Sequence, residues 1–138
     1  MSRKSEMEIE ADVFKIVSGS GIKKSISGRV YRDGMRPKNA KTEDIVVSFL
    51  TGTDGQIQQG YVLVHVYVPD ILSPNGDGEL VKNISRIKVL QSAVNDSLSN
   101  IENPEYLFEI TDTPKTYEVE GMRQHFINVR LFYKRITL

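Results

Sequence analysis

Two β-rich runs joined by a tight turn constrain the fold of this chain more than any other feature of its sequence. The first run covers residues 45–51, the second covers residues 57–68, and Gly52-Thr53-Asp54-Gly55 lies between them. Asp and Gly favour such turns because they tolerate positive φ angles. We therefore predict that the two runs are neighbouring antiparallel strands.

The second run has two apolar faces. Successive side chains of a strand point to opposite sides. Here one side consists of valines and the other of larger side chains: Val62, Val64, Val66 and Val68 against Tyr61, Leu63, His65 and Tyr67. Because neither side is strongly polar, we expect this strand to lie in the middle of a sheet that is covered on each face.

Two amphipathic segments predict helices. Residues 5–17 repeat apolar side chains at helical spacing, and Ser5 with Glu8 has the form of a capping box at the start of that helix. Residues 80–98 carry a second apolar stripe at steps of three or four, and Asp77 is the expected N-cap of the second helix.

The remaining β-rich runs complete an α+β pattern. We predict further strands at residues 26–31, 106–111 and 126–136, and a short one at residues 117–119. The order α-β-β-β-α-β-β predicts a mostly antiparallel sheet of four or five strands with two helices packed on it. A chain of 138 residues has the usual size of one domain, so residues 1–138 are expected to form a single domain.

Composition narrows the classes of function. Basic and acidic residues number 18 each, and the zero net charge argues against binding nucleic acid by bulk electrostatics. The chain has no cysteine, which excludes disulfides, thiolate chemistry and the usual structural zinc sites. We expect no membrane span and no signal peptide, because no apolar run is long enough for either.

No pattern in the sequence marks a catalytic site. His65 and His125 are the only histidines, they are far apart in the chain, and no nucleophile-elbow motif accompanies them. His65 lies between apolar neighbours and is most simply a partly buried structural histidine. We expect no catalytic residue, no cofactor and a protein that is not an enzyme.

The loop after the second run is rich in oxygen ligands. Asp70, Asn75, Asp77 and Glu79 are of the type that suits calcium, but the EF-hand spacing is absent. Turn formation and helix capping explain the same residues. We therefore expect no metal site in this loop.

Charges are unevenly distributed near the N-terminus. An acidic segment at residues 6–12 precedes a basic stretch at residues 23–41, which contains a long polar loop. Long loops inside a compact domain are often functional contacts, whereas a charge run by itself is usually a solvated face. If the loop is a contact between molecules, four basic side chains reach across to a neighbouring molecule, and four acidic side chains are the candidate acceptors: Arg32, Arg36, Lys38 and Lys41, and Glu6, Glu8, Glu10 and Asp12.

The order of these elements resembles one known family. After the first helix the chain reads Ile26-Ser27-Gly28-Arg29-Val30-Tyr31, Arg36-Pro37, Glu43-Asp44-Ile45-Val46-Val47 and Val62-Leu63-Val64-His65-Val66-Tyr67-Val68-Pro69-Asp70, and a long helix and more strands follow. In order and pattern, nearly the whole chain is similar to the tail terminator or tail-completion proteins of long-tailed bacteriophages and prophages.

The resemblance implies a structural virion protein of a phage tail or neck. Such proteins form a hexameric ring that caps the tail tube and joins it to the head–tail connector, with DNA at most passing through the lumen. The implied partners are other copies of the chain, the tail tube protein and the connector protein. The implied location is the virion, after assembly in the host bacterial cytoplasm.

Two alternatives remain open at this point. One is another head–tail joining protein, such as a head-closure or adaptor protein, for which the same ring logic holds. The other is a small hydrolase or metal-dependent enzyme that uses His65 or the loop at residues 70–79.

Overall fold

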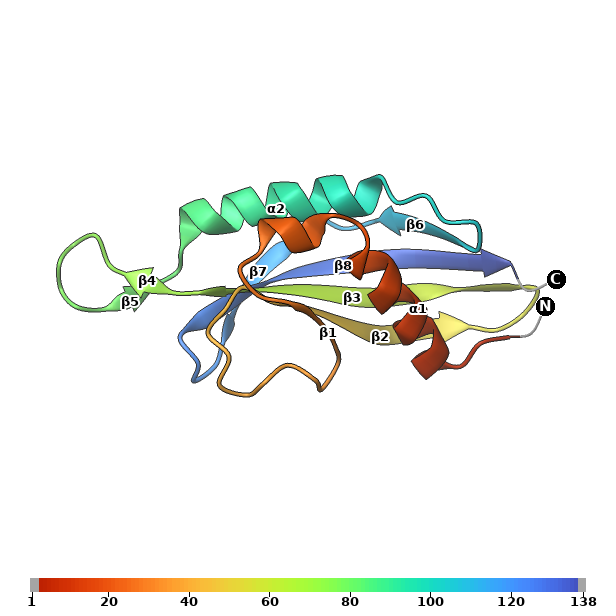
Figure 1. The fold of residues 1–138 in the computed structure, drawn as a ribbon, viewed down its shortest axis with the longest axis horizontal. Coiled ribbons are helices and arrows are strands. Elements are labelled where there is room, and N and C mark those ends of the chain that lie inside the picture. Colours follow the sequence, from red (N-terminus) through yellow and green to blue (C-terminus); the bar gives the residue numbers. More distant parts are fainter. Residues whose placement is uncertain (1–2, 137–138) are drawn as a thin grey trace.

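The computed structural model describes residues 3–136 of the chain. In chain order the elements are α1 (Glu6–Ser18), the 3-10 helix η1 (Ile22–Ser25), β1 (Val30–Arg32), β2 (Ile45–Thr53), β3 (Ile57–Pro69), β4 (Ile71–Leu72), β5 (Leu80–Val81), α2 (Ile84–Ser99), β6 (Tyr106–Ile110), β7 (Lys115–Val119) and β8 (Gln124–Ile136). The predicted α+β class is confirmed, since two α-helices accompany a mostly antiparallel sheet (Figure 1).

The main sheet has six strands rather than the four or five expected. Its order is β1-β2-β3-β8-β6, and β7 pairs with another part of β8. The predicted antiparallel pairing of β2 and β3 is confirmed, with Ile45 opposite Val66. The long strands β3 and β8 pair from Ile57 opposite Ile136 to Pro69 opposite Gln124, and they form the middle of the sheet.

The core lies between the two helices and one face of the sheet. The four valines of β3 are at most 1% exposed, and they join one cluster with Val13 of α1 and Leu90 of α2. The central position of β3 is confirmed, but the expected cover on each face is wrong. Both amphipathic helices bury their stripes in this one cluster, so the opposite side chains of β3 stay only partly buried.

Helix boundaries follow their capping residues. The capping box at α1 is confirmed: Ser5 Oγ accepts from the Glu8 backbone N–H at 3.3 Å, and Glu8 Oε1 accepts from the Ser5 N–H at 3.0 Å. The expected start of α2 is wrong by four residues. Asn83, not Asp77, is its N-cap, and its Oδ1 accepts from the Arg86 N–H at 3.2 Å.

The residues placed at the start of α2 form a small hairpin instead. Leu80 and Val81 pair antiparallel with Leu72 and Ile71, and Figure 1 shows this β4–β5 hairpin standing off one end of the molecule. The chain reverses direction through glycines at positions 76 and 78, with φ of 75° and 78°, values that an α-helix does not contain.

The first strand is shorter than expected and runs parallel to its neighbour. β1 begins at Val30, not at residue 26, and pairs parallel with β2. The preceding backbone is held by other partners, because the Gly28 N–H donates to the Glu43 carbonyl at 2.8 Å and the Arg29 N–H donates to Asp44 Oδ1 at 2.8 Å.

Candidate interaction surface

The uncovered face of the sheet is the most unusual feature of the molecule. We call it the open face; its centre consists of Tyr61, Leu63, His65 and Tyr67 of β3 and Phe126, Asn128, Arg130 and Phe132 of β8. All eight side chains are half-buried although no helix covers them. A solvated sheet face ordinarily carries polar side chains. A partly exposed face with this many apolar side chains is a candidate interaction surface.

Aromatic rings contact one another across the strands of the open face. His65 and Phe126 lie 4.5 Å apart between ring centroids, Tyr61 and Phe132 are 5.6 Å apart, and Tyr117 of β7 stacks on Phe126 at 5.6 Å. Such cross-strand ring contacts fix the side chains in place before any partner arrives. A rigid aromatic surface loses little conformational entropy on binding, which suits it to protein–protein contact.

One part of the open face holds unsatisfied polar atoms. The guanidinium carbon of Arg130 lies 4.4 Å from the Tyr61 ring centroid, and its Nη1 lies 3.4 Å from Asp112 Oδ2. Arg130 Nε and Asn128 Oδ1 are buried and have no hydrogen-bond partner among the described residues. They border a hollow of about 600 Å³ that Lys115 also lines. A buried donor and acceptor without partners lose free energy that an incoming polar group would restore.

The polar loop after β1 folds across the other end of this face. Arg36 stacks on Tyr67 at 4.1 Å, and its Nε donates to Asp44 Oδ2 at 2.9 Å. Its Nη2 donates to Gln124 Oε1 at 3.0 Å, and Gln124 in turn donates to the Ala40 carbonyl at 2.5 Å. Arg36 is therefore an internal anchor of the loop, a role that the sequence gave no sign of.

The other basic residues of the hypothesised interface divide into two groups. Arg32 Nε pairs with Glu10 Oε1 at 3.0 Å, and Glu10 is only 3% exposed. The partner of Arg32 thus lies in its own chain, not in a neighbouring molecule as the hypothesis expected. Lys38 and Lys41 are exposed at the loop surface. Of the four basic side chains proposed to reach a neighbour, these two lysines are the ones that extend into solvent.

The acidic residues of the same hypothesis lie along α1. Glu6 and Glu8 are exposed in the first turn of α1, where their negative charges interact favourably with the positive end of the helix dipole. Asp12 is engaged within the molecule: its Oδ2 accepts from Lys4 Nζ at 2.5 Å and from the Tyr106 hydroxyl at 2.7 Å. Among these eight described residues, the structure joins Arg32 to Glu10. The other six of these described residues do not hydrogen-bond to one another.

Asp12 belongs to a polar network that ties both ends of the chain to the sheet. Lys4 also pairs with Glu105 at 2.9 Å, and Glu105 accepts from the buried Arg135 of β8. Hydrogen bonds from Lys4 and Arg135 hold the pKa of Glu105 below its usual value. Burial opposes the charge of Asp12, but the bonds from Lys4 and Tyr106 outweigh it and lower its pKa as well. The network stabilises the carboxylate forms and hence the folded state near neutral pH.

The two histidines lie on opposite faces of the sheet. His65 is on the open face, and burial lowers its pKa despite the opposing effects of Asn128 and Asp33. His125 is opposite Val68 on the helix side, where its Nδ1 lies 2.7 Å from Asp70 Oδ1. Each histidine thus has structural contacts of its own, and the two do not form one site.

The oxygen-rich loop is built as a turn. Asp77 Oδ1 accepts from the Glu79 N–H at 3.0 Å, and the Ser73 N–H donates to the Glu79 carbonyl at 2.7 Å. Within residues 3–136, no three His, Asp or Glu side chains gather in the manner of a metal site. Over the same residues, the helices are too short or too polar to cross a membrane.

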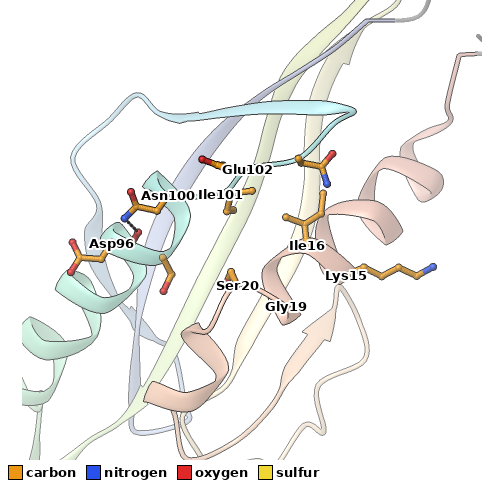
Figure 2. A pocket seen from close by; sticks show the side chains of 10 residues that line it. Lys15, Ile16, Gly19, Ser20, Asp96, Asn100, Ile101 and Glu102 are labelled. Atoms are coloured by element: carbon orange, nitrogen blue, oxygen red, sulfur yellow. Dashed lines mark hydrogen bonds between the residues drawn. The ribbon is translucent and has the colours of Figure 1, made fainter.

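A second hollow, of about 570 Å³, lies between the C-terminal ends of α1 and α2. Figure 2 shows Ile16 of α1 and Ile101 beside this hollow, and Lys15 directed away from it. Asp96 of α2 and Glu102, which follows α2, also line the hollow. Asn100 donates to the Asp96 carbonyl at 2.8 Å and so closes its own helix end. Polar groups do not converge on one point here, which a small-molecule site requires.

Neither the scan of protein-family models nor the search of curated proteins finds a match to this chain. The evidence for the open face as a candidate site is therefore its own geometry. A sequence signal for it did exist, since one side of β3 carries Tyr61 and Tyr67, and the β8 residues opposite them are Phe132 and Phe126. The pattern could not say which face the helices would leave uncovered.

Proposed function

We propose that this chain is a structural assembly protein of a phage tail or neck, acting as a tail terminator ring. The observation that carries the proposal is the open face, an aromatic sheet surface that no helix within residues 3–136 covers and that the loop after β1 reaches at its Tyr67 end. The resemblance to tail terminators supplies the kind of assembly; the open face supplies a reason for the molecule to associate.

A ring needs two different complementary patches on each subunit. Its interfaces are heterologous, so one surface of a subunit meets another surface of the next, and closure limits the assembly. Half-buried aromatic and arginine side chains such as Phe126 and Arg130 are the residue types that dominate binding energy at protein interfaces. The open face is thus suited to be one of the two patches.

The proposed function predicts that the same genome encodes a tail tube protein, and that protein supplies the test. Purified chain is added to tube protein during polymerisation, and the products are viewed by electron microscopy. We expect tubes of limited length that carry a ring at one end. Tubes of unrestricted length without rings, at a molar excess of the chain, would overturn the proposal.

The loop lysines are tested separately, because Arg36 is bound inside the molecule by Asp44 and Gln124. The double variant Lys38→Glu, Lys41→Glu reverses two exposed charges without touching the internal network. Its matched control is Lys23→Glu, Lys24→Glu, which reverses two exposed charges on η1. If the loop contributes to the ring, the first variant weakens capping and the control does not. Equal behaviour of the two variants removes the loop from the interface.

The alternative of a head-closure or adaptor protein differs in its partners. It predicts that the ring binds the connector and leaves tube growth unchanged. The same mixing experiment with the connector protein separates the two functions.

A further inference from the structure

The β4–β5 hairpin is built like an arm. We define the arm as residues 71–81, which follow β3 directly and extend past the end of the sheet in Figure 1. Its apolar side chains face solvent: Ile71 is 43% exposed, Leu72 67% and Leu80 36%. Two-stranded hairpins are marginally stable alone. An arm with an exposed apolar surface gains stability when it packs on something else.

The arm and the open face complement each other in polarity and charge. The arm carries two carboxylates, Asp77 and Glu79, and no lysine or arginine. The hollow beside Arg130 is lined by two cations, Lys115 and Arg130, and by the carboxylate of Asp112, which pairs with Arg130. Elsewhere on the strand positions of the open face, Lys134 adds a third cation and Glu109 a second carboxylate, so the positive charges remain in excess. The apolar side chains of the arm therefore match the aromatic rings of the open face, and the negative tip of the arm matches the positive charges beside those rings. Such a pairing favours one orientation of the arm on the open face.

We propose that the arm of one copy docks on the open face of the next copy in the ring. Leu72 and Leu80 pack on the rings around Phe126, and the tip of the arm reaches the hollow beside Arg130. There a carboxylate of the tip accepts from Arg130 Nε, and a backbone N–H of the tip donates to Asn128 Oδ1. This contact satisfies both buried atoms that lack hydrogen-bond partners within residues 3–136.

The occupant is a second copy because the arm extends away from the sheet of its own chain (Figure 1). Arm and open face are different surfaces of one molecule, which is the arrangement that a closing heterologous ring requires. This inference rests on the proposed ring function and specifies its contact.

Site-specific cross-linking tests the contact directly, since the chain has no cysteine of its own. Two single variants are prepared, Leu72→Cys in the arm and Tyr117→Cys beside Phe126 on the open face. They are mixed, allowed to assemble alone or on tail tubes, and treated with a short bismaleimide. The control replaces Tyr117→Cys by Val89→Cys, which is 54% exposed on α2. We expect cross-linked heterodimers from the first mixture and at least tenfold fewer from the control.

A second measurement uses self-association by analytical ultracentrifugation and by ring counting on tubes. Leu72→Glu is expected to raise the dissociation constant at least tenfold, and Val89→Glu is expected to leave it within twofold of wild type. Both substitutions place a carboxylate at an exposed apolar position, and circular dichroism verifies that each variant is folded.

The outcomes separate this contact from the function on which it rests. Rings that form without the 72–117 cross-link and tolerate Leu72→Glu overturn the arm contact and leave the ring function standing. A Leu72→Cys cross-link to the tube protein alone overturns it in favour of a different occupant. A chain that does not self-associate at millimolar concentration, alone or on tubes, overturns both.

Discussion

Removing the carboxylate of Asp44 tests whether the loop after β1 is held by one buried ion pair. Asp44 is 0% exposed and accepts three hydrogen bonds: from Arg36 Nε at 2.9 Å, from Thr42 Oγ1 at 2.8 Å and from the Arg29 N–H at 2.8 Å. The Arg36 side chain is only 9% exposed. In Asp44→Ala a buried guanidinium would lose its counter-ion, and a backbone N–H would lose its acceptor.

The expected cost follows from burial. Breaking a buried ion pair by removing one partner destabilises proteins by about 3–5 kcal/mol, because the other charge stays uncompensated. In urea, with a denaturant slope of about 2 kcal/mol per molar, a loss of about 4 kcal/mol lowers the unfolding midpoint by about 2 M. Asp44→Asn keeps the shape of the side chain and should fall between wild type and Asp44→Ala.

The control is Asp112→Ala, which removes a carboxylate from an exposed pair. Asp112 lies 3.4 Å from Arg130 and its side chain is 54% exposed, so its loss should cost about 0–1 kcal/mol. Urea unfolding is followed by circular dichroism, and hydrogen exchange reports on the loop amides. If Asp44→Ala costs less than about 1 kcal/mol, like the control, the ion pair does not hold the loop and the argument fails.

Two further predictions concern stability. The pKa values of Asp12, Glu43 and Glu105 are lowered in the folded state, so the stability that these carboxylates contribute is present above about pH 4.5 and is lost as the pH falls through their folded-state pKa values. Melting temperatures measured from pH 7 to pH 3 should therefore drop steeply below about pH 4.5. A flat profile would contradict the pKa directions. A Cβ at Gly60 would lie 2.0 Å from a backbone carbonyl of β2, so Gly60→Ala should destabilise by about 3 kcal/mol or more in urea unfolding. Gly19→Ala, whose new Cβ meets nothing closer than 3.5 Å, should be neutral, and equal effects of the two would refute the steric argument.

Local sequence patterns predicted a large part of the fold. The turn signal at Asp54-Gly55 indicated the pairing of β2 with β3, although β2 continues to Thr53 and leaves the turn to residues 54–56, and the capping box at Ser5 indicated the start of α1. Both signals act between residues close in the chain, so the sequence displays them directly. The start of α2 was misplaced because the apolar residues Leu80 and Val81 fit a helical stripe as well as a hairpin strand.

The candidate site was less accessible from the sequence. The pattern showed that β3 has two apolar faces, but the distribution of charge could not show which of the charged side chains are bound inside the molecule. Arg36 looked like a free surface cation; in the fold it is held by Asp44 and Gln124, the latter 88 positions further along the chain. Charge runs do not reveal such distant partners.

What the sequence by itself determined is the α+β class, the central strand β3 and the apolar character of both its sides, because helical and strand periodicities are properties of neighbouring residues. What only the tertiary structure decided is which side stays open. That choice depends on α1 and α2 both packing on the valine face, a contact between segments far apart in the chain. The burial of those two stripes in one core leaves the rings around Phe126 without a helix over them.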